Sequence, residues 1–236
     1  MDIKKQYFEL IKQRINDVYD LNAEKMKKVA KMFGECMQNL GVVQLVGFKH
    51  SEEFVNEMFY RAGGIAPYHG LKLKDLVLKG MYDQAKIETG EVYSDLSVID
   101  KWNQIYQMDD RDMWCLVSFY GDEPVLEEIA KRAKAKGQKV VVVINTKSNR
   151  GNLLDYADEY LDMGAPNEDV AQYIDNTPIG QLSSTSTNVM AQMLTAEVYN
   201  YYVSIGKDAP VLLSANIKGA DIHNNSLTDP YERRVR

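Results

Sequence analysis

Three short, continuously apolar stretches constrain the fold of this 236-residue chain more than any other feature. They occupy residues 41–47 (GVVQLVG), 112–118 (DMWCLVS) and 139–144 (KVVVVI), and a weaker candidate lies at 159–163. Apolar runs without the alternation of a half-exposed strand are typical of strands buried on both faces. Helical patterns separate them, which predicts an α/β fold with a parallel sheet. Ligands in such sheets bind beyond the carboxyl ends of the strands.

The first forty residues predict two amphipathic helices ahead of the sheet. Each has an apolar stripe at helical spacing, Asn22 is placed to cap the second helix, and Gly41 ends it. We therefore divide the chain into a helical extension, residues 1–40, and a main domain, residues 41–236. An oligomer surface and simple packing on the same chain are both open for the extension. The tail from Pro210 is rich in Asn, Gly and Ser and is predicted to be irregular.

A run of five hydroxyl residues opens the helix predicted at 188–203. The start of a helix leaves several backbone N–H groups unpaired, and the helix dipole favours negative charge there. Hydroxyl groups at that place add donors for phosphate oxygens, and one hydroxyl is already enough for an N-cap. The run therefore favours an anion site over a plain cap, which stays the alternative. Its members are Ser183, Ser184, Thr185, Ser186 and Thr187.

Charge and composition argue against several partners and cofactors. The formal net charge of −6 does not suit nucleic acid or an anionic membrane, and no apolar run approaches transmembrane length. The N-terminal residues lack the apolar core of a signal peptide, which predicts a cytoplasmic protein. Two cysteines give no disulfide framework, and three histidines without paired spacing argue against a metal centre. Glycine-rich nucleotide motifs are absent from the sequence, so we expect no cofactor.

Several segments together resemble the sugar isomerase (SIS) domain family. The chain is most similar to the uncharacterised bacterial SIS proteins that have an N-terminal helical extension. The matching segments follow one another along nearly the whole chain, and the FYRAGG phrase and the C-terminal segments are the most specific. They are residues 46–51 (VGFKHS), 57–64 (EMFYRAGG), Ser118-x-x-Gly121, 184–187 (STST), 214–216 (SAN) and 221–224 (DIHN).

This resemblance implies a three-layer α/β/α sandwich with a five-stranded parallel sheet, preceded by the two N-terminal helices. It also implies a homodimer or larger assembly, with a phosphorylated sugar as ligand. The family's phosphate contacts correspond to Ser51, Ser118 and the segment from Thr185 to Thr187. The full set of substrate-binding candidates is Gly47, Lys49, Ser51, Arg61, Ser118, Gly121, Ser184, Thr185, Ser186 and Thr187.

Two loops depart from the family pattern. Phe48 and Lys49 stand where the family has a small residue and a second glycine, which removes easy access to a positive φ but offers a cation to the ligand. In the second loop Tyr120 replaces a small hydroxyl residue. Asp122 and Glu123 stand at the start of the next helix, where a phosphate would otherwise sit. These carboxylates would repel a dianion at close range.

Proton transfer between adjacent sugar carbons needs a base, and Glu57 is the first candidate. Arg61 follows one helical turn later, and the Glu-x-x-x-Arg spacing resembles the catalytic helix of phosphoheptose isomerases. A surface ion pair is the alternative. Glu197 is a second candidate base, and His50 and His223 are candidate acids. The catalytic histidine of those isomerases would fall near Met193 and is missing, and we expect a structural role for His69.

The sequence therefore predicts a phosphosugar-binding protein that acts as a metal-independent aldose–ketose sugar-phosphate isomerase. Two alternatives stay open. One is a non-catalytic sensor that binds a sugar phosphate and reports to a protein partner. The other is an etherase or lyase acting on a hexosamine 6-phosphate derivative.

Overall fold

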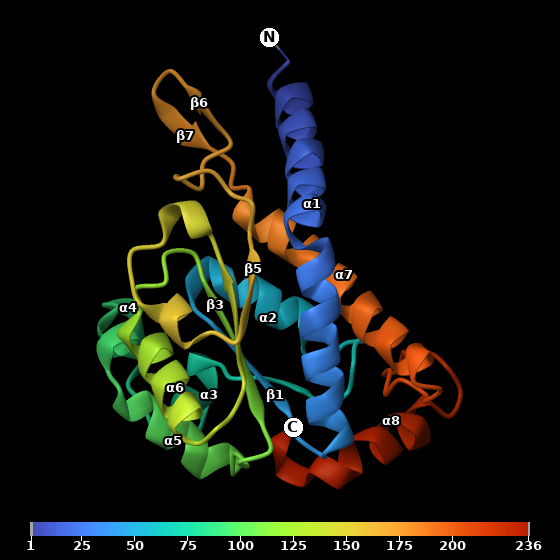
Figure 1. Cartoon of the computed structure of the whole chain (residues 1–236). Helices are drawn as coiled ribbons and strands as arrows, with labels where there is room; N and C mark the ends of the chain where they lie inside the picture. The colour runs from blue at the N-terminus through green and yellow to red at the C-terminus, as the bar shows by residue number, and fades with distance from the viewer. Residues whose placement is uncertain (1, 236) are drawn as a thin grey trace.

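The computed structural model describes residues 2–235 and shows a parallel sheet with helices on both faces (Figure 1). The five strands lie in the order β2-β1-β3-β4-β5, and every pairing among them is parallel. The three apolar runs form the three inner strands, so the predicted α/β sandwich with a five-stranded parallel sheet is confirmed. The strands are β1 (Val43–Gly47), β2 (Tyr68–Gly70), β3 (Met113–Ser118), β4 (Val140–Ile144) and β5 (Glu159–Asp162).

Helices cover each face of this sheet, and alternate strand residues point to opposite layers. In β4, Val141 and Val143 join the core formed with α1, α2 and α7, whereas Val140, Val142 and Ile144 join the core formed with α3, α5 and α6. Both faces are buried, which explains why the strands read as continuous apolar runs. The helices are α1 (Ile3–Gln38), α2 (Glu52–Met58), α3 (Leu73–Leu78), α4 (Gln84–Glu88), α5 (Ser97–Tyr106), α6 (Pro124–Ala135), α7 (Ser183–Ser204) and α8 (Ala220–Thr228).

Shorter elements connect these layers. An antiparallel hairpin, β6 (Gln172–Ile174) and β7 (Thr177–Ile179), lies between β5 and α7 and projects beyond the sheet beside α1 (Figure 1). The sequence did not predict this hairpin. The 3-10 turns are η1 (Lys49–Ser51), η2 (Glu91–Ser94), η3 (Thr146–Ser148), η4 (Leu153–Tyr156) and η5 (Asp229–Arg234).

The prediction of two N-terminal helices is wrong, because α1 is one continuous helix of 36 residues. Asn22 is fully buried inside it rather than capping a second helix. Its amide donates to the carbonyl oxygens of Val18 at 2.7 Å and Asp162 at 2.8 Å, and its Oδ1 accepts the Asp162 N–H at 2.7 Å. These bonds fasten α1 to the end of β5, and the inner face of α1 shares a core with the sheet and α7.

The tail is also more ordered than its composition predicts. It forms α8 and η5, which lie along the end of the molecule near the start of β1 (Figure 1). The side-chain amide of Asn224 accepts the Leu213 N–H at 2.8 Å and donates to the Leu213 carbonyl at 2.9 Å, which pairs the backbone of an extended stretch with the helix. The order of the tail thus depends on a long-range side-chain contact, which local sequence patterns do not reveal.

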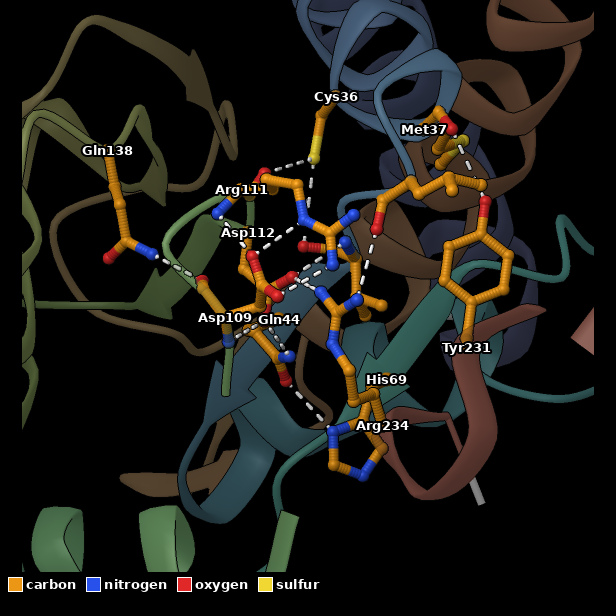
Figure 2. A network of polar contacts seen from close by, with 12 residues as sticks. Cys36, Met37, Gln44, His69, Asp109, Arg111, Asp112, Gln138, Tyr231 and Arg234 are labelled. Atoms are coloured by element: carbon orange, nitrogen blue, oxygen red, sulfur yellow. Dashed lines mark hydrogen bonds and ion pairs between the residues drawn. The ribbon is translucent and has the colours of Figure 1, made fainter. Parts of the chain in front are cut away.

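A buried polar network closes the amino-terminal edge of the sheet (Figure 2). The carboxylate of Asp112 accepts the Val42 N–H and the Gln44 side-chain amide, each at 2.9 Å, and forms an ion pair with Arg234 of the tail. The Gln44 Oε1 atom lies 2.8 Å from Nδ1 of His69. This network holds β1, β2, β3 and the C-terminal segment together, and it lies at the edge opposite the candidate site. His69 therefore has the structural position that the sequence analysis expected.

Candidate functional site

A cavity of about 470 Å³ lies at the carboxyl-terminal edge of the sheet. Five segments surround it: the turn after β1, the 3-10 turn η2, the loop after β3, the connection after β5, and the start of α7. This is the edge at which parallel sheets bind ligands. The lining residues are Phe48, Lys49, His50, Ser51, Tyr93, Phe119, Tyr120, Asp122, Glu123, Met163, Glu168, Asp169, Val170, Gln181, Ser183 and Thr187.

The turn after β1 keeps a tight shape without the family's second glycine. Lys49 adopts a left-handed φ of 54°, the conformation that a glycine would take at low cost. A Cβ atom on Gly47 would lie 2.6 Å from the carbonyl oxygen of Ser51, so only glycine allows the turn to close. The Lys49 ammonium lies 4.5 Å from the centre of the Tyr93 ring, within the range of a cation–π contact. Lys49, His50 and Ser51, three of the predicted site residues, all line the cavity.

Ser118 lies directly beneath the loop after β3 and is fully buried. Its Oγ accepts the N–H of Gly121 at 2.6 Å, and Gly121 takes a left-handed φ of 69°. The same hydroxyl donates to the carboxylate of Glu123. Burial raises the pKa of Glu123, and the Ser118 hydrogen bond opposes that shift. An acid of this chain therefore already holds the predicted phosphate-binding hydroxyl.

The start of α7 shows the same arrangement. The carboxylate of Asp169 accepts the backbone N–H groups of Leu182 at 3.1 Å and Ser183 at 2.9 Å, and also the Ser183 hydroxyl. Asp169 thus caps the helix from fourteen residues before it, and no residue of the hydroxyl run occupies the N-cap position. The hydroxyls of Ser186 and Thr187 donate back to the Ser183 carbonyl at 3.0 and 2.9 Å.

Ser184 and Thr185 are half-buried in the first turn of α7 and are not among the lining residues. Ser186 is buried beneath them, while Thr187 reaches the cavity. The hydroxyl run therefore contributes Ser183 and Thr187 to the site directly.

His50 is tied to the segment that precedes α7. Its Nε2 lies 3.0 Å from Nε2 of Gln181, and the Gln181 carbonyl accepts the hydroxyl of Tyr7 at 2.9 Å. The N-terminal part of α1 is thereby connected to the rim of the cavity through two side chains. Gln181 and Tyr7 were both missed by the sequence analysis, since nothing near them in the sequence indicates a contact across such separations.

The remaining candidate catalytic residues lie away from the cavity. Glu57 lies in the last turn of α2 and forms an ion pair with Arg61, which lies beyond the end of that helix at Met58, so the predicted helical spacing of the pair is wrong. The Glu57 carboxylate also accepts the Gln192 amide of α7 at 2.5 Å. Glu197 is half-buried midway along α7. His223 is exposed on α8, with its Nε2 3.0 Å from the Val211 carbonyl. The lining of the cavity includes none of Glu57, Arg61, Glu197 and His223. It also lacks Gly47 and Gly121, although both glycines shape its loops.

The cavity wall is rich in carboxylates. Asp122 and Glu123 were expected at this place, and both line the cavity without filling its volume of about 470 Å³. Glu168 and Asp169 add two further acids from the connection after β5, and Lys49 is the lysine among the lining residues. The polar loop that carries Glu168 and Asp169 gave no sequence signal for a site, because Asp169 meets α7 only through the fold.

Two further observations concern metals and membranes. Among the side chains that the structure describes, in residues 2–231 and 234–235, no group of three or more His, Cys, Asp or Glu gathers in an arrangement that would hold a metal ion. Within the same range, every helix is too short or too polar to cross a membrane.

Comparison with known proteins identifies the family. Residues 6–145 match the model of the SIS domain, which is more than half of the chain. The chain belongs to the SIS domain family. Curated relatives of this SIS protein include the UPF0309 protein of Geobacillus thermodenitrificans, 28% identical over 98% of this chain and 95% of the relative. Another is a UPF0309 protein of Caldanaerobacter subterraneus, 29% identical over 98% of each chain.

Solved structures show the same fold at low sequence identity. The phosphoheptose isomerase of Francisella tularensis superposes with a TM-score of 0.60 at 16% identity, covering 84% of this SIS protein and 96% of that chain. The NanR protein of Vibrio vulnificus, complexed with ManNAc-6P, superposes with a TM-score of 0.55 at 13% identity. The superposition covers 97% of this SIS protein and 69% of that chain. At these identities the likeness supports the architecture, in agreement with the sheet order described above.

Proposed function

We propose that this SIS protein binds a sugar phosphate in the cavity at the carboxyl edge of its sheet. The observation that carries the proposal is the convergence of Lys49, Ser51, Ser183 and Thr187 on one cavity of about 470 Å³. Its volume lies in the range of small-molecule sites. The phosphate would face the start of α7 and the Lys49 ammonium, where hydroxyls, the backbone N–H groups that Asp169 holds and a positive charge lie together. The SIS-fold neighbours named above include a sugar-phosphate complex and a phosphosugar isomerase.

Aldose–ketose isomerisation without a metal is the reaction we propose for the bound sugar. It requires a base whose pKa approaches neutrality and an acid for the oxygens. Glu123 lines the cavity with a pKa raised by burial, and His50 lines the same cavity. These two residues are better placed in this chain than Glu57, whose carboxylate is held by Arg61 and Gln192. The base role predicted for Glu57 stays a prediction that the same assay tests.

The test combines binding with turnover. A thermal-shift panel of hexose, hexosamine, pentose and heptose phosphates identifies ligands, and proton NMR follows conversion of each hit. Glu123→Gln is expected to abolish conversion while retaining binding, with Glu57→Gln as the matched variant outside the cavity. Conversion that survives Glu123→Gln and is lost in Glu57→Gln would show that Glu57 of α2, and not Glu123, is the base. The absence of any binding would overturn the proposal.

A non-catalytic sensor is the second candidate function, and one observation favours it. The Ser118 and Ser183 hydroxyls are both bound by carboxylates of this chain, which suits a site that responds to a ligand more than one built for turnover. A thermal shift with sugar phosphates and no conversion of any of them would support the sensor. Its protein partner would then be sought with the ligand present.

We also propose that the protein is cytoplasmic and assembles as a homodimer or larger oligomer. The N-terminal part of α1 projects from the body and exposes apolar side chains, among them Ile3, Phe8 and Leu10 (Figure 1). Exposed apolar groups on one projecting helix suit an interface between copies. Light scattering after size exclusion tests this assignment, and Phe8→Glu is expected to shift the mass toward the monomer. A monomeric mass for the unchanged protein would contradict it.

A further inference from the structure

Asp169 occupies the position at the start of α7 that suits an anionic ligand. This helix is 22 residues long, and its first N–H groups have no acceptor within the helix. The Asp169 carboxylate takes two backbone N–H groups, of Leu182 and Ser183, and one hydroxyl, of Ser183. A phosphate oxygen bound there would accept the same donors. The protein thus fills the most anion-attracting point of its cavity with a carboxylate of its own.

Asp169 belongs to a strap, which we define as residues 164–182, the connection from β5 to α7. The strap supplies Glu168, Asp169, Val170 and Gln181 to the cavity wall and includes the β6–β7 hairpin. Its two arms are held together by the Ala171 N–H, which donates to the Gly180 carbonyl at 2.9 Å. The first arm is also held at the Asn167 carbonyl, which accepts the Ser148 hydroxyl at 2.8 Å. Release of Asp169 from α7 would therefore free the part of this arm beyond Asn167, with the hairpin moving as one body.

We propose that Asp169 is a built-in competitor that the phosphate of the ligand must displace from α7, so that ligand binding opens the strap. This inference rests on the proposed function, because it takes the ligand to carry a phosphate. Two anions cannot share the same N–H donors, and like charges within a few ångströms repel in a partly buried site. Wild-type affinity is then lower than the donors alone would give, and ligand occupancy is coupled to the position of the strap.

The test compares Asp169→Asn with the wild-type protein. Asn caps helices about as well as Asp, so the substitution removes the charge and keeps the cap. Glu168→Gln is the matched control, because its carboxylate lines the same cavity and accepts the Tyr173 hydroxyl at 2.5 Å rather than the donors of α7. Calorimetry with inorganic phosphate and with fructose 6-phosphate is expected to show affinity higher by about tenfold in Asp169→Asn. In Glu168→Gln the gain should stay below about threefold.

Hydrogen exchange gives a second readout that a purely structural cap would not move. In the wild-type protein, saturating phosphate should accelerate exchange of strap amides 170–180, because the bound anion replaces Asp169. Equal or weaker binding by Asp169→Asn, with wild-type binding intact, would overturn this inference alone. So would strap amides that become more protected on binding. Failure of the wild type and the variant to bind either probe would overturn both this inference and the proposed function.

Discussion

His69 is a buried histidine that makes the stability of the fold depend on pH. It is 2% exposed, its Nδ1 lies 2.8 Å from Gln44 Oε1, and burial lowers its pKa from 6.5 to about 4. Between these values the unfolded chain binds a proton that the folded chain does not, so stability falls as pH falls. Integrating this difference from about pH 7 to about pH 5 gives a loss of about 2 kcal/mol for this one group.

The substitution His69→Asn isolates the contribution of this histidine to the pH dependence of stability. An Asn amide reproduces the Nδ1–H donor toward Gln44 and does not titrate, so the pH-dependent loss should be smaller by about 2 kcal/mol than in wild type. Urea unfolding at about pH 7 and about pH 5 measures the change in the free energy of unfolding between these pH values for each protein. Val198→Ala, a substitution in the buried core on α7, is the control and should shift stability equally at both pH values. Equal pH slopes in wild type and His69→Asn would refute the assignment of a neutral buried imidazole.

Three further outcomes follow from the loops and the tail. Lys49→Gly should keep or raise the thermal midpoint, since the left-handed backbone costs a non-glycine residue about 1–2 kcal/mol, yet it should weaken sugar-phosphate binding in calorimetry. A lower midpoint with unchanged affinity would contradict this. Gly47→Ala should destabilise the protein by about 1–3 kcal/mol in urea unfolding, because its Cβ meets the Ser51 carbonyl. Arg234→Ala should cost about 3 kcal/mol by leaving Asp112 buried without its cation, and a loss near zero would show that the ion pair is dispensable.

The sequence predicts the inner sheet well because its signal is local. The Val-rich run of β4 is buried along its whole length, so its apolar character alone indicates a buried strand. The turn after β1 and the hydroxyl run at α7 were likewise expected at one edge, since parallel strands end on the same side. One missed element had a usable signal: Asp175 and Asn176 join β6 and β7 with positive φ values, the residue types that two-residue hairpin turns prefer.

Other features depend on contacts between distant residues. Asn22 is a residue type that often caps helices, but its amide pairs with the backbone of Asp162, 140 positions away, and α1 continues through it. Asp169 caps α7 from a polar loop that gives no local indication of its partner. Glu57 and Arg61 were expected one turn apart on a single helix, but α2 ends at Met58, and Glu57 contacts Gln192 of α7 rather than the cavity. Spacing in the sequence suggests which side chains can meet, whereas the end of the helix and its packing fix what those side chains face.

The most direct measurement of the central claim follows the amide signals of Ser184 and Thr185 by NMR during titration with a sugar phosphate. These N–H groups belong to the first turn of α7, beside the donors that Asp169 holds. We predict that their signals shift together with that of Lys49 and saturate along one binding curve. Saturable shifts confined to residues outside the cavity, or no shift at any concentration of ligand, would contradict the account.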